Sequence, residues 1–431
     1  MTAEFEPRIV AFLCNWCTSA AADLAGVSRF KYPSNILPVR VMCSGMVDPF
    51  YVMYAFKQGA DGVLMGGCHI GDCHYLTGNW QTQKRVPLLK KLLESLGIDP
   101  RRLRLEWISA SEGARFVEVA HEFVGEIKQL GPNPLKGVSP DGGAPARRLA
   151  KSAEEAGSYP VDEVRRLCKE ALAQKKVDVI YGLKEENGDL MPHFFQSAAE
   201  IDHLGLDGEH RLFFTYRPIN EDILALVQKR HPELKIGLVA RGCDERALFE
   251  LAKRAQVKLA SLEIIGVACD QKQAAACRCA TPYPLNLTVG TKVEGIAEDQ
   301  QVAEFLKLSL DERLAFWSRE LAKCVKCYGC RNSCPVCACT ECRMEQECFM
   351  ARGFVPPEFP LFHFVQFMHH ADRCTDCGEC EHACPMDIPL RLMKKIMRAE
   401  VGKLFNYVPG ADATHISPFA TIQSGGPSHD A

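Results

Sequence analysis

The feature that most constrains this chain is a cysteine pattern that occurs twice near its C-terminal end. The two runs read Cys324-x-x-Cys327-x-x-Cys330-x-x-x-Cys334-Pro335 and Cys374-x-x-Cys377-x-x-Cys380-x-x-x-Cys384-Pro385. Three cysteines at every third position wrap a loop round three irons of a cubane, and the fourth, before the proline, reaches across to a second cluster. The pattern therefore predicts two [4Fe–4S] clusters, one held by Cys324, Cys327, Cys330 and Cys384 and the other by Cys334, Cys374, Cys377 and Cys380.

The composition indicates in which cellular compartment such clusters would function. The chain has 431 residues with 22 cysteines, 51 basic and 54 acidic residues, and a net charge of −3. This near balance gives no support for binding to nucleic acid. Residues Met1–Pro7 lack the order of a secretory signal, and no apolar run approaches the roughly 18 residues of a spanning helix. We therefore expect a cytoplasmic protein without a transmembrane segment, in which clustered thiols hold metal or carry out redox chemistry.

Residues 1–130 alternate short apolar runs with helical patterns. Strands are predicted at Ile9–Leu13, Leu37–Met42, Gly62–Met65 and Leu103–Ile108, and helices at Thr18–Phe30, Asp48–Gln58, Gln81–Leu96 and Ser111–Leu130. This alternation predicts an α/β domain with a parallel sheet between helices. Functional groups in such sheets gather beyond the carboxyl ends of the strands.

Five cysteines follow three of these predicted strands. They are Cys14 and Cys17 after the first strand, Cys43 after the second, and Cys68 and Cys73 after the third. Four thiolates at one rim of a sheet would hold an iron–sulfur cluster or a zinc ion, so the five cysteines compete for four positions. The alternative is a set of separate structural cysteines.

The motifs in this region resemble a known family. Phe12–Cys17, Cys43–Met46 and Gly67–Tyr75 are similar to the delta subunit of methyl-viologen-reducing hydrogenases, over about residues 6–130. The resemblance implies a [2Fe–2S] cluster held by four of the five cysteines. It also implies electron transfer between a hydrogenase or other donor and a heterodisulfide-reductase-type flavoprotein.

Residues 131–160 are rich in turn residues and predict a linker to a second α/β domain, residues 161–320. Strands are predicted there at Val177–Leu183, Arg211–Tyr216, Lys235–Ala240 and Ser261–Val267, and helices at Val161–Gln174, Asn220–Arg230 and Glu245–Val257. Two of these strands are followed by Cys243 and Cys269, and Cys277 and Cys279 come soon after. These four cysteines are either the ligands of a third [4Fe–4S] cluster or buried structural thiols.

A second resemblance covers residues 161–405. Val239–Ala247, Ile264–Cys269 and Tyr328–Asn332 are similar to the beta subunits of deazaflavin-reducing hydrogenases and of related formate dehydrogenases. The spacing Cys277-x-Cys279 departs from the Cys-x-x-Cys of related chains. The resemblance implies a flavin such as FAD, but no Gly-x-Gly-x-x-Gly follows a strand here to support one.

The remaining C-terminal features divide into three groups. Residues 321–405 predict a two-cluster ferredoxin-like module, in which Cys337, Cys339, Cys342 and Cys348 either complete the middle site or line a cluster pocket. Asp387–Val401 predicts an amphipathic helix with Lys394, Lys395 and Arg398 on a solvated face. Residues 406–431 predict an extended tail.

These patterns lead to an electron-transfer component of a multi-subunit redox complex as the first functional hypothesis. Other redox subunits are the expected partners, including a heterodisulfide-reductase-like flavoprotein of a kind that could bifurcate electrons. The alternative is the flavin-containing electron-input subunit of a formate dehydrogenase or hydrogenase that acts on a deazaflavin or nicotinamide. A zinc-stabilised scaffold is a third interpretation. The sequence shows no nucleophile–base constellation, so no catalytic residue is predicted.

Overall fold

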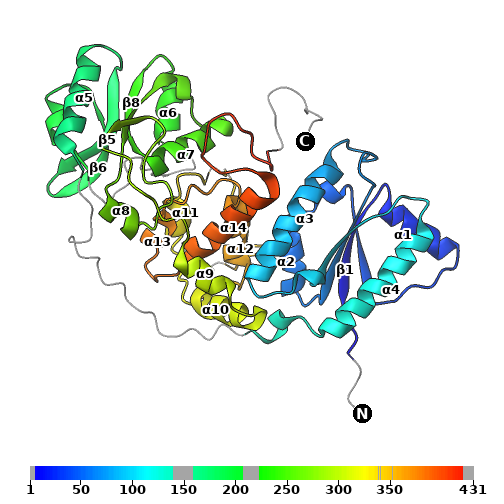
Figure 1. Cartoon of the computed structure of the whole chain (residues 1–431). Coiled ribbons are helices and arrows are strands. Elements are labelled where there is room, and N and C mark those ends of the chain that lie inside the picture. Colours follow the sequence, from blue (N-terminus) through cyan, green and yellow to red (C-terminus); the bar gives the residue numbers. More distant parts are fainter. Residues whose placement is uncertain are drawn as a thin grey trace.

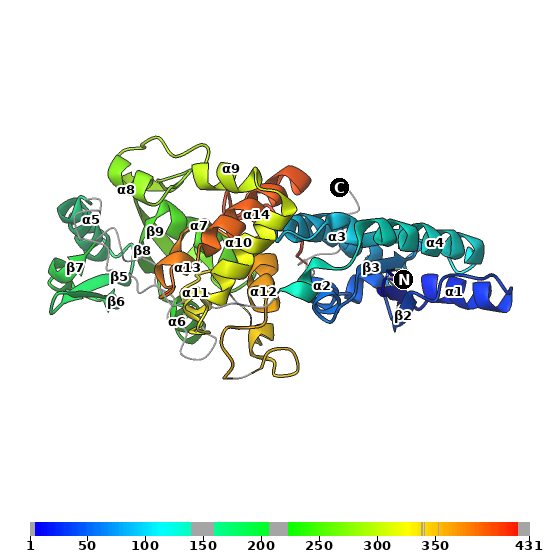
Figure 2. The ribbon, with the colours of Figure 1, turned by 90° about the horizontal axis from the view of Figure 1, so that it is seen from below.

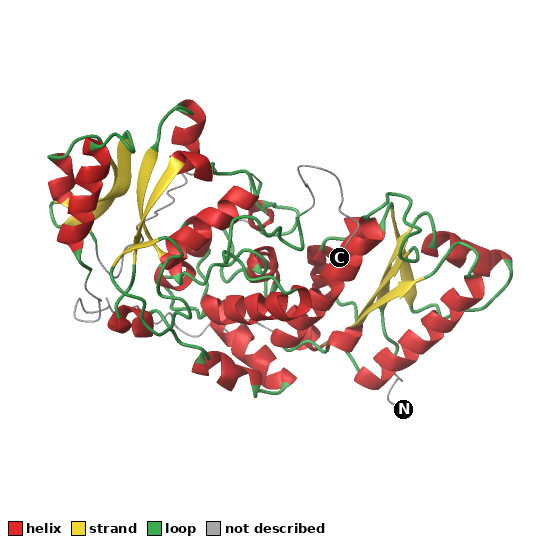
Figure 3. Ribbon diagram, turned by 45° about the horizontal axis from the view of Figure 1, so that its top comes forward, coloured by secondary structure: helices red, strands yellow, loops and turns green. Residues whose placement is uncertain are grey.

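The structure is a computed structural model that describes residues 5–138, 159–206 and 223–420, except residues 338, 340 and 352. Two α/β units lie at opposite ends of the molecule, and a helical module lies between them (Figure 1). The same order is visible from below (Figure 2). The two sheets are thus separated by helices (Figure 3).

The N-terminal unit is built on the predicted parallel sheet. Its strand order is β2 (Ile36–Val41), β1 (Ile9–Cys14), β3 (Gly62–Gly67) and β4 (Leu103–Trp107). Helices α1 (Thr18–Val27) and α4 (Gly113–Leu130) cover one face, and α2 (Pro49–Lys57) and α3 (Gly78–Ser95) cover the other. Alternate residues of β1 supply the two cores, with Ile9, Ala11 and Leu13 on the α1–α4 side and Phe12 on the other.

The second unit is a mixed sheet. Its strand order is β10 (Leu287–Val289), β9 (Leu262–Val267), β8 (Ile236–Arg241), β5 (Val179–Glu186) and β6 (Asp189–Phe195), with β7 (Leu204–Gly205) also paired to β5. The helices of this unit are α5 (Val161–Ala173), α6 (Ile223–Arg230), α7 (Gly242–Lys253) and α8 (Gln271–Ala276). Strands β5, β8, β9 and β10 are parallel, whereas β6 and β7 run antiparallel to β5.

The sequence analysis missed the hairpin that joins β5 to β6. Its turn is Asn187-Gly188, and both residues have positive φ angles, 56° and 87°. This pair is a strong hairpin signal, because a type I′ turn needs two residues that tolerate left-handed backbone. The predicted strand Arg211–Tyr216 and residues 139–158 of the predicted linker lie outside the described residues.

The helical module follows the second sheet in the chain. Its helices are α9 (Gln300–Leu306), α10 (Leu310–Ala322), α11 (Gly329–Asn332), α12 (Leu361–His370), α13 (Glu379–His382) and α14 (Leu390–Phe405). The two short helices α11 and α13 contact each other, and α14 packs on α12 and α3. None of the described helices is both long enough and apolar enough to span a membrane.

One continuous hydrophobic core joins the N-terminal unit to the helical module. It contains residues of α2 and α3 together with residues of α10, α12 and α14. Trp317 of α10 is fully buried in it, contacts Phe367 of α12, and donates its indole N–H to the Ser95 carbonyl at 3.0 Å. Gly97 follows α3 with φ +86°, and a Cβ there would lie 2.3 Å from the Leu310 carbonyl. Only glycine permits this close contact between the two parts.

The module is also tied to the second unit. The carboxylate of Glu250 in α7 is fully buried and accepts hydrogen bonds from the Tyr407 hydroxyl at 2.8 Å and the Gly410 N–H at 2.7 Å. Arg254, the residue that follows α7, forms an ion pair with Asp372 at 3.1 Å. Residues 406–420 therefore pack against α7 without forming a helix or strand, and residues 421–431 of the predicted extended tail lie outside the described residues.

Replacing Trp317 tests the shared core. We expect Trp317→Ala to lower the free energy of unfolding by about 3–5 kcal/mol, because it leaves a cavity between α3, α10 and α12. Trp317→Phe keeps the ring but leaves the Ser95 carbonyl without its donor, which costs about 1–3 kcal/mol. Urea unfolding followed by circular dichroism measures both. Leu306→Ala, at a side chain exposed by 43%, is the control that should change little, and an equal effect there would contradict the assignment.

Candidate iron–sulfur sites

The N-terminal site lies where three parallel strands end. Cys14 is the last residue of β1, Cys43 comes two residues after β2, and Cys68 directly follows β3. Cys17 is the residue before α1. Because these strands are parallel neighbours, their ends deliver the thiols to one edge of the sheet.

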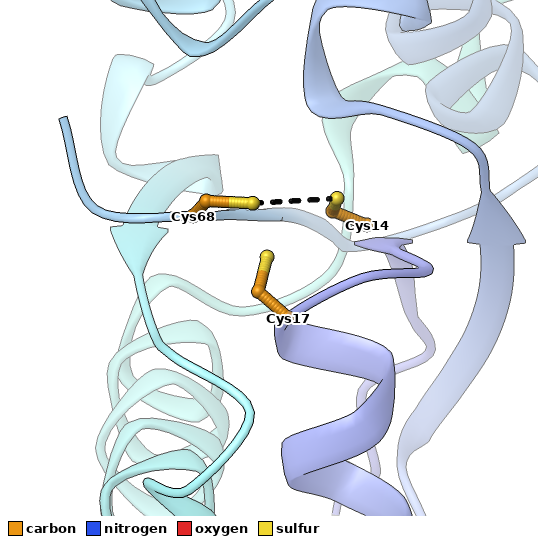
Figure 4. A group of neighbouring side chains, drawn as sticks. All are labelled: Cys14, Cys17 and Cys68. Carbon is orange, nitrogen blue, oxygen red and sulfur yellow. Dashed lines mark hydrogen bonds between the residues drawn. The ribbon is translucent and has the colours of Figure 1, made fainter. Parts of the chain in front are cut away.

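Three of these thiols form a compact group (Figure 4). The sulfur atoms of Cys14, Cys17 and Cys68 all lie within 4.8 Å of one another, and those of Cys14 and Cys68 are 3.8 Å apart. All three residues are buried. Among the described residues, no other set of three or more metal-ligating side chains meets this distance.

The other two thiols of this region form a neighbouring pair. The Cys43 and Cys73 sulfurs lie 3.7 Å apart, and the Gly45 N–H donates to the Cys43 sulfur at 3.4 Å. Gly78, the first residue of α3, lies against this pair, since a Cβ at that position would lie 2.2 Å from the Cys43 sulfur. Glycine is therefore required where α3 begins.

The three thiols of the compact group differ in pKa. The Cys17 thiol donates to Cys14 and, helped by the Trp16 N–H, lowers the pKa of Cys14 to about 6 against the effect of burial. The same hydrogen bond and burial raise the pKa of Cys17. Burial also raises the pKa of Cys68. A thiolate at Cys14 is the ionic form that binds metal, so the site is prepared for a cationic centre.

Aromatic residues adjoin the cysteines of this site along the chain. The ring of Trp16 stacks on that of His74 with centroids 3.8 Å apart, and the Trp16 indole N–H donates to the Tyr75 hydroxyl at 3.4 Å. Trp16 and Tyr75 are both exposed, whereas Cys17 and Cys73, close to them in the chain, are buried.

The two C-terminal cysteine runs have the same backbone conformation. In the first, Lys326 and Tyr328 have φ angles of 52° and 57°; in the second, Asp376 and Gly378, at the equivalent positions, have 58° and 85°. The third cysteine of each run lies in a short helix, α11 or α13, and the Ser333 hydroxyl joins the two by donating to the carbonyl of Glu379 at 3.2 Å. The left-handed residues give the two loops the same bend, within which Cys330, Cys334, Cys374, Cys380 and Cys384 are buried and Cys327 is exposed.

Burial raises the pKa of several thiols in these two runs. The pKa of Cys324 is raised to about 11, with contributions from Cys384 and Cys327. Burial likewise raises the pKa of Cys334 to about 12 and of Cys380 to about 11, and Cys374 contributes to both. No three sulfur atoms of these runs lie within 4.8 Å of one another among the described residues, so the crossed ligand sets stay a prediction.

The middle group of cysteines surrounds the carboxyl ends of β8 and β9. Burial raises the pKa of Cys269 to about 12, and the charges of Cys243 and Cys277 add to the effect. The Tyr159 hydroxyl lies 3.6 Å from the Cys269 sulfur. The Gln273 amide donates to the Cys277 sulfur at 2.9 Å, and Arg246 lies 3.9 Å from the Cys279 sulfur.

The four cysteines between the two runs have different surroundings. Cys337 is buried with Cys334 and Val336 against Ala247 of α7. Cys339 and Cys342 are half-buried, and Cys348 is exposed. The single Cys168 is buried in the core of the second unit. These residues do not form a four-thiol group in the part of the chain that the structure describes.

The prediction of a solvated basic face on the last long helix is wrong at Lys394. This side chain is buried, with 2% of its surface exposed, whereas Lys395 pairs with Asp299 at 2.6 Å. The amphipathic pattern marks α14 correctly as a helix. This sequence pattern does not show which part of the protein covers the face of α14 that carries Lys394.

Comparison with known proteins identifies the N-terminal region. A family model described as "Methyl-viologen-reducing hydrogenase, delta subunit" matches residues 9–131. The iron–sulfur subunit of an F420-non-reducing hydrogenase from Archaeoglobus profundus is 55% identical over 132 residues, which are 31% of this chain and 96% of that protein. The chain belongs to this family. The resemblance predicted from the motifs at Cys14, Cys43 and Cys68 is thereby confirmed.

Two other relatives are proteins that share only part of their length with this chain. One is a component of the ferredoxin/F420H2-dependent CoB–CoM heterodisulfide reductase of Methanosarcina acetivorans, 53% identical over 126 residues, which are 29% of this chain and 16% of that protein. The other is the beta subunit of an F420-dependent formate dehydrogenase from Methanocaldococcus jannaschii, 36% identical over 134 residues, 30% of this chain and 35% of that protein. This chain therefore covers only a small part of each of these two relatives.

The residues present fit iron–sulfur centres. The compact group consists of sulfur donors alone, and Gly78 has no side chain to collide with the neighbouring Cys43 sulfur. In the module, both runs have the cubane spacing and share left-handed residues at equivalent positions.

Substitution of Cys43 and of Cys73 can test which of these two cysteines is the fourth ligand of the N-terminal site. We expect Cys43→Ser to abolish the N-terminal centre and Cys73→Ser to preserve it, because the charge of Cys43 interacts with that of Cys14 and its sulfur accepts the Gly45 N–H. Iron analysis should show a loss of about two irons per chain in Cys43→Ser only. As the control, paramagnetic resonance of the reduced chain should show that the signals of the other proposed clusters are unchanged in both variants. Loss of the centre in Cys73→Ser would contradict this assignment.

Proposed function

We propose that this chain is an iron–sulfur electron-transfer subunit of a multi-subunit redox complex. The observation that carries the proposal is that the N-terminal thiol site and the two cysteine runs belong to parts joined by one hydrophobic core. Electron transfer needs centres held at fixed separations, and a continuous core holds them so. The family of the N-terminal region, whose relatives are iron–sulfur subunits of hydrogenases, supports the same function.

The proposed cofactors are a [2Fe–2S] cluster in the N-terminal site and two [4Fe–4S] clusters in the module. When bound, such clusters accept and release single electrons. The chain's own residues bury the thiols, exclude water, and donate backbone N–H groups to sulfur, as Gly45 does to Cys43. The many free thiols fit a reducing, cytoplasmic compartment.

A third [4Fe–4S] cluster at Cys243, Cys269, Cys277 and Cys279 is a further part of the proposal. Its support is the contact between this group and the module. Arg391 of α14 pairs with Asp376 at 2.6 Å and donates to the Cys277 carbonyl. A cavity of about 310 Å³ is lined by both Cys277 and Cys377. The middle group is thus adjacent to the second cysteine run, where another centre could exchange electrons with it.

The proposed partners are other redox subunits, including a heterodisulfide-reductase-like flavoprotein. Support comes from the Methanosarcina relatives, in which a region about half identical to part of this chain is contained in one longer chain of a heterodisulfide reductase. A region that is fused to that chain in one organism is well suited to bind an equivalent separate chain in another.

A second candidate function is that of a flavin-containing electron-input subunit for a deazaflavin or nicotinamide. The relationship to a formate dehydrogenase beta subunit is the observation that favours it. Bound flavin would distinguish the two functions, since an electron-transfer protein with clusters alone releases none.

Anaerobic purification of the full chain tests the proposed function. We expect roughly ten or more irons per chain, with a similar amount of acid-labile sulfide. Dithionite should reduce the clusters, and the reduced protein should pass electrons to a one-electron dye. Flavin released on heating would favour the second candidate. Zinc in place of iron would contradict both.

Crossed ligation in the module can be tested by combining substitutions. Cys384→Ser should remove the cluster of the first run, a loss of about four irons per chain. The double variant Cys384→Ser/Cys330→Ser should then lose no more iron, because both residues serve one cluster. The matched variant Cys384→Ser/Cys380→Ser should lose about four more. The opposite pattern in the two double variants would contradict the crossed assignment.

A further inference from the structure

Helix α14 places a lysine where a charged group is costly. Lys394 has 2% of its surface exposed, and moving an ammonium group from water into a protein interior is unfavourable unless an anion compensates for it. Two neighbouring basic residues of the helix have carboxylate partners. Arg391 pairs with Asp376 and Lys395 pairs with Asp299, each at 2.6 Å.

Lys394 has no such partner among the described residues. No ion pair within 4.0 Å joins its ammonium to a carboxylate in the part of the chain that the structure describes. Helix α12, which packs on α14, carries the buried polar side chains His363 and Gln366. Burial lowers the pKa of His363 to about 3, so this imidazole is neutral and supplies no negative charge.

The groups that can supply negative charge to Lys394 are cysteine sulfurs of the module, which carry it as thiolates. Burial acts to lower the pKa of Lys394, but the charges of nearby thiolates outweigh burial and raise it. These thiols are Cys380, Cys334, Cys374 and Cys330. Contacts of α14 place this part of the helix beside the second cysteine run. Arg391, one turn before Lys394, pairs with Asp376 at 2.6 Å, Lys395 lies 3.7 Å from the same carboxylate, and α14 contacts α13, which holds Cys380.

These thiols are divided unequally between the two proposed clusters. Cys334, Cys374 and Cys380 belong to the ligand set of the second cluster, whereas Cys330 belongs to that of the first. The contacts of Arg391 and Lys395 with Asp376, a residue of the second run, likewise associate this part of α14 with the second ligand set.

We infer that Lys394 is a fixed positive charge that raises the reduction potential of the [4Fe–4S] pair, chiefly that of the cluster held by Cys334, Cys374, Cys377 and Cys380. This inference rests on the proposed function, because it needs the two clusters. A thiolate-bound cluster becomes more negative on reduction, and a buried cation nearby stabilises the reduced form. The interaction is strong because the surroundings have a low dielectric constant. Lys394 therefore makes the second cluster the preferred position for the first electron.

The test compares three variants of the full chain, purified without oxygen. Lys394→Met removes the charge at similar length, and Lys394→Arg keeps the charge. Lys403→Met removes one charge from the exposed end of the same helix, where Lys403 pairs with Glu400. A redox titration followed by paramagnetic resonance gives the potential of each cluster, and iron analysis gives the number of clusters.

The expected result is that Lys394→Met keeps its iron but reduces at a more negative potential, with the larger shift at the second cluster. Lys394→Arg should remain near the wild-type potential, and Lys403→Met should not shift it. Unchanged potentials in an iron-complete Lys394→Met would overturn the inference. If Lys394→Met loses iron, the Lys394→Arg variant decides between charge and shape. Full iron in Lys394→Arg, at the wild-type potential, supports a role of the charge. The same loss of iron in Lys394→Arg shows that the shape of the side chain matters and overturns the inference.

The wild-type chain separates this inference from the proposed function. Absence of cubane signals from the wild-type protein would contradict the proposed function itself. Presence of those signals, with potentials that do not respond to Lys394, would contradict only the role of the lysine.

Discussion

The architecture depends on the hydrophobic core that continues from the N-terminal unit into the helical module. Trp317 fills the space between α3 and α12, and Gly97 allows the turn after α3 to touch the start of α10. Close packing makes such a junction rigid, because a core tolerates few voids and little displacement. The distance between the N-terminal thiols and the module is consequently a property of the fold. A flexible connection would leave that distance undefined.

Backbone conformation, more than side-chain chemistry, brings the thiols together. Parallel pairing of β1, β2 and β3 directs three strand ends to one edge, so cysteines that are distant in sequence become neighbours. In the module, left-handed residues at Lys326 and Asp376 bend both runs in the same way. Gly78 then leaves room for the Cys43 sulfur. The result in the N-terminal unit is that the sulfur atoms of five cysteines lie in one group of three and one neighbouring pair.

Much of this arrangement could be predicted from local patterns. Apolar runs followed by helical periodicity identified the strands of the N-terminal sheet, and the Asp48-Pro49 pair begins α2 as capping rules require, with the Asp48 carboxylate accepting the Phe50 N–H at 2.8 Å. The hairpin at Asn187-Gly188 was missed although its turn signal is local. The burial of Lys394 could not be predicted, because helical periodicity shows which residues share a face of the helix but not which part of the protein covers that face.

The sequence by itself determined that the chain is rich in clustered thiols, that two of its cysteine runs have cubane spacing, and that its N-terminal strands form a parallel sheet. These properties depend on spacing and periodicity along the chain. Only the tertiary structure decided that Cys14, Cys17 and Cys68 form a compact group beside the Cys43–Cys73 pair. It also decided that the Lys394 ammonium is enclosed beside the thiols of the module. The physical reason is that both results depend on which distant surfaces pack together, and burial changes the energy of every charge enclosed there.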